Sequence, residues 1–222
     1  MDSSSAVQQE QFKKEKEFIK TLAEHLYVGS ADKTKAAVIN YGSFPSTSVK
    51  FDEYSSLKSL KGGVERMTPA QGSRRIDRAL DKTADLLRPT DPLSTKILVL
   101  LTTGKQAQES DVTPLDVSIQ PIKDMGSAVY VIALGNEPST QELRPLVTKL
   151  EDMFRVPFIA MEYDARRVAK HIRDGTFLEL HSSVTKMKRA SCLRFTNFLQ
   201  VLKPSCQLRK IEMDCEQTKN PH

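Results

Sequence analysis

The chain has 222 residues, of which 39% are hydrophobic and 27% are charged. This balance is typical of a globular protein rather than a disordered or fibrous one, and the length allows one domain with a substantial core plus a tail. No apolar run approaches the roughly 20 residues that a membrane-spanning helix needs. The sequence therefore predicts no membrane span, and its polar, acidic start is unlike a signal peptide.

The net charge of +5 is concentrated near the C-terminus, because residues 178–222 carry eight Lys or Arg against four acidic residues. These bases are scattered and lack interleaved aromatic residues, so we do not expect nucleic-acid binding. The three cysteines, whose spacings fit no zinc motif, lie in the same segment: Cys192, Cys206 and Cys215. We therefore predict a main domain at residues 1–177 and a basic tail at 178–222, which is loosely packed or part of a truncated further region.

Helical and strand patterns alternate through the first half of the chain. Apolar residues at helical spacing predict a helix over residues 5–26, and Ile76 to Leu87 predict another that Pro89 ends. Between them, residues 36–42 and 48–53 predict two strands, the second an exposed antiparallel edge. A short helix is expected at residues 55–60.

The second half contains continuous apolar runs, which are typical of strands covered on both faces. They predict strands at residues 96–102, 128–135 and 156–160, separated or followed by helices near 114–125, 140–150 and 165–173, with Gly175 as the last stop. The order indicates an α/β fold, a three-layer, doubly wound and mostly parallel sheet with one antiparallel edge strand. Ligands of such folds bind where loops leave the carboxyl ends of the strands.

Asp2 and the serines that follow it open the first predicted helix. A carboxylate and hydroxyls at alternate positions can bind one hard divalent cation. Asp and Ser are also preferred N-cap residues, so capping is the competing interpretation. The residues alone leave both open.

Three stretches carry a resemblance when they are taken together. They are Asp2-Ser3-Ser4-Ser5-Ala6, Gly72-Ser73-Arg74-Arg75-Ile76 and Ile97-Leu98-Val99-Leu100-Leu101-Thr102-Thr103-Gly104-Lys105, followed by the apolar strand that ends at Gly135. In this order and spacing, residues 1–177 resemble the Rossmann-like von Willebrand factor A (vWA) domain, particularly the copies in collagen VI and matrilin-like matrix proteins.

The resemblance implies a metal-ion-dependent adhesion site made by an Asp-x-Ser-x-Ser loop, a Thr and a second Asp. This chain keeps Asp2 and Ser4, but Ala6 replaces the second Ser and Thr103 replaces the second Asp. The Thr position falls on Arg74 or, with a shift of one residue, on Ser73. We therefore expect a degenerate site (Asp2, Ser4, Ser73, Thr103) without a resident cofactor, binding Mg²⁺ or Mn²⁺ only weakly.

The resemblance further implies a non-enzymatic adhesion or scaffolding module. Arg74, Arg75 and Lys105 would lie together on the top loops and contact a protein partner, such as a matrix protein or an acidic or sulfated surface. The alternative for these three residues is that they are solvated loop bases. The family also implies an extracellular location, although an intracellular vWA module in a multiprotein assembly is an alternative.

A central strand should precede the Asp loop in this family, yet only Met1 stands before Asp2. Without this strand, the two strands on either side of its position would have unpaired backbone groups. Either residues 193–202 fill the position or the chain is truncated. A phosphate-binding α/β enzyme is the less favoured alternative, because Gly104-Lys105 lacks the other residues of a phosphate loop. No catalytic constellation was found.

Overall fold

The computed structural model describes residues 1–29, 34–54 and 56–190, without the side chains of 176–190. It divides into two compact units, Met1–Thr176 and Phe177–His222. The three cysteines and residues 193–202 lie outside the described residues, so the predictions made for them stay untested. The first unit contains every strand of the described residues.

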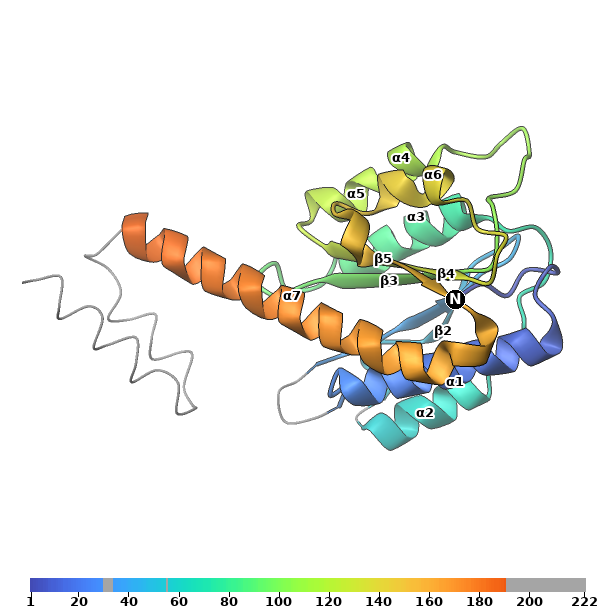
Figure 1. Cartoon of the computed structure of the whole chain (residues 1–222), viewed down its shortest axis with the longest axis horizontal. Helices are drawn as coiled ribbons and strands as arrows, with labels where there is room; N and C mark the ends of the chain where they lie inside the picture. Colours follow the sequence, from blue (N-terminus) through green and yellow to red (C-terminus); the bar gives the residue numbers. More distant parts are fainter. Residues whose placement is uncertain (30–33, 55, 191–222) are drawn as a thin grey trace, which may run out of the picture. The chain divides into compact units, whose positions relative to one another are not determined.

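The first unit is a three-layer α/β fold, as predicted (Figure 1). Strands β3 (Ile97–Thr102), β4 (Ala128–Leu134) and β5 (Met153–Val156) form a parallel sheet in the order β3-β4-β5. Helices α3 (Ile76–Leu87), α4 (Leu115–Ser118), α5 (Gln120–Asp124) and α6 (Thr140–Leu143) lie on one side. On the other side lie α1 (Gln9–His25), α2 (Leu57–Glu65) and the first turns of α7 (Met161–Ala190).

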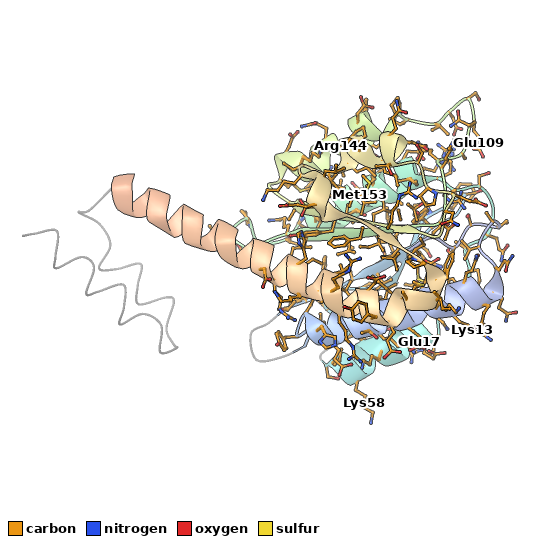
Figure 2. All side chains as sticks on the ribbon, viewed as in Figure 1. Lys13, Glu17, Lys58, Glu109, Arg144 and Met153 are labelled. Carbon is orange, nitrogen blue, oxygen red and sulfur yellow. The ribbon has the colours of Figure 1, made fainter. Side chains whose placement is uncertain are left out.

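The pattern of the buried residues explains this layering. Val129, Val131 and Ala133 of β4 pack toward α3, whereas Tyr130, Ile132 and Leu134 pack toward α1 and α7. A strand with apolar residues at every position must be covered on both faces. Figure 2 shows side chains filling the space between the sheet and both helical layers.

Several predicted boundaries were wrong, and proline accounts for three of them. Strand β5 covers Met153–Val156 rather than 156–160, because Pro157 has no N–H for the ladder and a 3₁₀ turn, Phe158–Ala160, follows it. Pro121 lies in the first turn of α5, so the predicted helix at 114–125 is two short helices. Pro145 similarly places a 3₁₀ turn, Arg144–Leu146, directly after α6.

Two helix ends also differ from the prediction. Helix α7 passes through Gly175 and reaches Ala190, so Gly175 is no stop. Helix α1 begins at Gln9, with Gln8 as its N-cap and Gln11 completing a capping box. Asp2 therefore does not cap this helix, because Gln8 holds the N-cap position.

The described strands form two sheets instead of one. Strands β1 (Val38–Asn40) and β2 (Ser46–Val49) pair antiparallel with each other, apart from the β3-β4-β5 sheet. Met1–Ser3 lies beside the end of β1 through a parallel bridge between Asp2 and Tyr41. Within the described part of the chain, no strand continues this segment between β1 and β3.

Candidate functional site

Asp2 is buried beside the carboxyl ends of strands β1 and β3. Its Oδ1 accepts a hydrogen bond from the Ser4 backbone N–H at 3.1 Å. Its Oδ2 accepts from the Thr103 N–H at 3.0 Å and from the Thr103 hydroxyl at 2.9 Å. Since Thr103 follows β3 directly, this carboxylate joins the N-terminal segment to the end of a buried strand.

Arg74 completes this group of contacts. Its Nε donates to Asp2 Oδ2 at 2.6 Å, its Nη2 to Thr103 Oγ1 at 2.8 Å and its Nη1 to the Lys105 carbonyl at 3.1 Å. The Arg74 side chain is only 11% exposed, and the Asp2 side chain is fully buried. We call Asp2, Arg74 and Thr103 the Asp2 cluster.

The backbone before α3 delivers Arg74 to this position. Gln71 and Gly72 both have positive φ angles, 63° and 76°, which makes a tight turn. The turn is bonded to the N-terminal segment, because Gln71 N–H donates to the Ser3 carbonyl at 2.9 Å and Ser5 N–H to the Gly72 carbonyl at 2.9 Å. Arg74 then follows the turn and points back across the Asp2 side chain.

Gly104 leaves room for the guanidinium. A Cβ at this position would overlap Nη1 and Cζ of Arg74. The guanidinium is fixed by three hydrogen bonds, so a larger residue at 104 would displace it from Asp2. The absence of a side chain at Gly104 is thus part of the site.

The residues present do not fit a divalent cation. Such an ion needs oxygen lone pairs, usually from more than one carboxylate. Here the single carboxylate, Asp2, faces a guanidinium, whose positive charge lies against the oxygen that an ion would need. Ser4 Oγ is buried and has no hydrogen-bond partner in the described residues, and Ser73 contributes only its backbone N–H, to Ser43 Oγ at 2.8 Å.

Arg75 has a separate role from Arg74. Its side chain is 2% exposed, donates to both carboxylate oxygens of Asp77 and reaches Asp111 Oδ1 and Glu109 Oε2 at 3.0 and 3.1 Å. These hydrogen bonds, chiefly the one with Asp77, raise the pKa of Arg75 above its ordinary value. Burial opposes ionisation of Asp77, but the hydrogen bonds from Arg75 and from the backbone N–H groups of Thr113 and Arg78, together with the charge of Arg75, outweigh it and lower the pKa of Asp77. Arg75 therefore holds the loop after β3, on whose outer part Glu109 lies (Figure 2).

Lys105 is the exposed base of the three that the sequence indicated. It borders a hollow of ≈ 460 Å³ between the loops that follow β3 and β4. The floor includes Gln106, whose backbone N–H donates to Glu142 Oε1 at 2.9 Å. The other lining residues are polar as well: Gln108, Ser139 and Gln141.

Glu15 is a buried ionisable residue that the sequence analysis missed. It lies on α1, is fully buried, and neither carboxylate oxygen has a hydrogen-bond partner in the described residues. Burial raises its pKa well above the usual range, and the negative charge of Asp2 raises it further. The spacing to Phe12, Phe18 and Leu22 places Glu15 on the apolar face of α1, which is the signal that could have identified it.

A family model described as von Willebrand factor type A domain matches residues 1–165. The protein named von Willebrand factor A domain-containing protein 2, from Xenopus laevis, is 30% identical over 148 residues, which cover 65% of this chain and 18% of that protein. Human matrilin-3 is 25% identical over 185 residues, which cover 73% of this chain and 37% of that protein. The chain thus spans well under half the length of these relatives.

A solved structure of proximal thread matrix protein 1 from the mussel byssus has the same fold, with a TM-score of 0.68 at 20% identity. The match covers 76% of this chain and 45% of the mussel chain. Another structure of the mussel protein is described with zinc in its metal-ion-dependent adhesion site (MIDAS) motif. At this identity the similarity shows a shared fold, and the metal is a property of the mussel protein.

Proposed function

Because the chain belongs to the von Willebrand factor type A domain family, we propose that it is a non-enzymatic protein-binding module of the adhesion or scaffolding type. We further propose that it binds its partner without a bridging metal ion. The observation that carries this proposal is the contact of the Arg74 guanidinium with Asp2 and Thr103. A cation supplied by the chain itself neutralises the carboxylate that would otherwise hold a metal ion.

The proposed binding face is the carboxyl end of the sheet around Lys105 and the neighbouring hollow. Arg75 is buried among carboxylates, and three of the Arg74 hydrogen bonds point inward, so neither guanidinium is free for a strong ion pair with a partner. Lys105 is exposed, and the hollow offers amide and hydroxyl groups beside the Glu142 carboxylate, which already accepts a hydrogen bond from the Gln106 N–H. This combination suits an acidic, hydrogen-bonding segment of a protein partner.

We place this function in an extracellular matrix setting. Support comes from the similarity to matrilin-3 and to a collagen alpha-1(VI) chain, which is 24% identical over 151 residues. No helix in the described residues is long and apolar enough to cross a membrane. A fluorescent fusion of the full-length transcript would distinguish this setting from an intracellular assembly.

Binding to an immobilised Glu-rich peptide, with a Gln-rich peptide as reference, tests the metal-free binding face. We expect Lys105→Glu to weaken binding about threefold to tenfold, since a surface ion pair is worth up to about 1 kcal/mol and reversal adds repulsion. Lys58→Glu is the matched control, because Lys58 lies on α2, on the other side of the sheet (Figure 2). Chelation by EDTA should leave binding unchanged.

Two results would contradict the proposal. Loss of binding in EDTA would mean that a metal ion bridges the partner. Equal weakening by Lys58→Glu would mean that the peptide responds to net charge and not to the Lys105 face.

A further inference from the structure

A groove runs between the loop that follows β3 and helix α6. It contains the hollow of ≈ 460 Å³ beside Lys105 and a second hollow of ≈ 300 Å³. Lys105 lines only the first hollow, and Asp116 lines only the second. Four residues line both hollows, which therefore form one continuous groove with two ends: Gln106, Gln108, Gln141 and Glu142. We call it the α6 groove.

Hydrogen bonds fix the wall that the loop provides. The side-chain amide of Gln106 is used at both ends, since its Oε1 accepts from the Asp77 N–H at 2.9 Å and its Nε2 donates to the Thr113 carbonyl at 2.9 Å. Farther along the loop, Arg75 Nη1 donates to Asp111 Oδ1 at 3.0 Å. These bonds hold the loop wall in place without the help of a partner.

The opposite wall is fixed as well. The Ser139 hydroxyl caps α6 by accepting from the Glu142 N–H at 3.3 Å, and Arg155 donates to the Thr140 hydroxyl at 2.8 Å. Glu142 Oε1 then joins the two walls, because it accepts from the Gln106 N–H. A groove that is formed in advance lowers the entropy cost of binding a partner.

The two ends of the α6 groove differ in charge. Lys105 and Asp116 are both exposed, and within the described residues neither side chain has a hydrogen bond or an ion pair. The part common to both hollows contains the Glu142 carboxylate. Lys123 and Arg144 lie near the Asp116 end, but neither lines the groove and both donate to backbone carbonyls. A segment that is acidic along its whole length would therefore meet two carboxylates.

The Asp116 end also has an apolar surface. Its lining includes Val112, which is half-buried, and Pro114 and Pro145, which are exposed. An arginine side chain suits this surface, because its methylene groups pack on apolar atoms while its guanidinium donates two parallel hydrogen bonds to a carboxylate. The chemistry of this end thus matches a long basic side chain.

We propose that the α6 groove binds an extended polypeptide segment of mixed charge, with an acidic residue at Lys105 and an arginine at Asp116. Between these two contacts, the amides of Gln108 and Gln141 would form hydrogen bonds with the backbone of the segment. The inference rests on the proposed function, because Lys105 is common to both. It adds the requirement for a basic residue, and this residue sets the direction in which the partner lies.

NMR titration of the full chain tests the inference. The probes are capped peptides with one Glu and one Arg, made in both orders and separated by about two to six Gly or Ser residues, which form a flexible linker. At the best spacing, we expect the mixed-charge peptide to bind about threefold to fivefold more tightly than the same peptide with Gln in place of Arg, since exposed ion pairs stabilise modestly. The amide signals of Asp116 and Gln141 should shift during the titration.

A charge reversal on the protein locates the arginine. Asp116→Arg should remove the preference for the mixed-charge peptide and should favour the peptide in which Glu replaces Arg. Asp124→Arg is the matched control, because Asp124 is exposed on α5 and does not line the groove. Thermal unfolding checks that both variants are folded, and the comparison of the Arg and Gln peptides tests the inference in the unaltered protein.

Three results would overturn the inference. The first is equal affinity for the Arg and Gln peptides at every spacing; if Lys105→Glu still weakens binding of the Glu-rich peptide, the proposed function stands alone. The second is an equal effect of Asp116→Arg and Asp124→Arg, which would indicate a response to net charge. The third is a shift of amide signals only outside the groove. A chain that binds neither these peptides nor the Glu-rich peptide would overturn the proposed function as well.

Discussion

Two carboxylates, Asp2 and Glu15, are buried completely in the same domain, but their surroundings differ. Asp2 accepts hydrogen bonds from Ser4, Arg74 and Thr103, one of them from a cation. Glu15 has no hydrogen-bond partner in the described residues, and its pKa is raised. The comparison shows that burial alone does not determine what a carboxylate contributes; the donors around it do.

The difference has consequences for function and for stability. The Asp2 carboxylate is already neutralised by Arg74, so it is poorly suited to bind an external cation. The Glu15 carboxylate is penalised when it ionises, and the domain carries that penalty at neutral pH. Three experiments test this contrast between the two carboxylates.

The largest expected effect is that of Arg74→Leu. The substitution leaves the Asp2 carboxylate buried without its cation, which typically lowers the free energy of unfolding by about 3–5 kcal/mol. Urea denaturation would measure it. Arg88→Leu is the control, because Arg88 pairs with Asp85 on the surface and such pairs are worth about 1 kcal/mol or less. A loss for Arg74→Leu as small as that of the control would show that Thr103 and Ser4 alone stabilise Asp2.

The second experiment is Glu15→Gln, which should stabilise the protein at pH 7 by about 1–2 kcal/mol, because a neutral amide costs less to bury than a carboxylate. The folded-state pKa of Glu15 is raised, so the native state holds this proton more tightly than the unfolded chain. The stability of the unaltered protein should therefore fall, through this group, as pH rises above the ordinary value of 4.5.

Thermal unfolding from pH 4 to pH 8 would check this direction. The difference between Glu15→Gln and the unaltered protein should be small at pH 4 and should grow as the pH rises. Destabilisation by Glu15→Gln at every pH would indicate that the ionised carboxylate has a favourable partner, such as the Met1 amine.

The smallest expected effect concerns metal ions. The unaltered protein should show no change in unfolding free energy with 10 mM Mg²⁺, since Arg74 lies against Asp2. Arg74→Thr should gain at most about 1.4 kcal/mol, because one carboxylate gives at best a millimolar site. Calorimetric titration with Mg²⁺ and Mn²⁺ gives the same comparison directly. A micromolar site in the unaltered protein that Asp2→Ala removes would refute the metal-free interpretation.

The apolar runs predicted the layers because a continuously apolar strand must lie inside the sheet with helices over both faces. The runs that contain Leu100 and Val131 gave β3 and β4 nearly to the residue. Strand β5 was misplaced because Met153–Val156 alternates with the exposed Arg155, a weaker signal than the apolar residues beyond Pro157. The sequence predicts too short a helix α7 because glycine often ends a helix, although packing can override its low helix propensity.

The candidate site was predictable in its position but not in its contacts. Asp2, Arg74 and Thr103 follow from three loops at one edge of the sheet. Which way the Arg74 side chain points depends on the left-handed turn at Gln71 and Gly72 and on the space at Gly104, and neither is visible in a linear pattern. Glu15 was hidden because a Lys- and Glu-rich helix suggests a solvated surface.

The close approach of Arg74 to Gly104 also constrains how this sequence can change over time. While Arg74 reaches Asp2, any side chain at position 104 would push the guanidinium away, so the two residues should be inherited together. A descendant that loses the arginine becomes free to place other residues at 104. Covariation between positions 74 and 104 would therefore identify the lineages in which an arginine faces the Asp2 carboxylate.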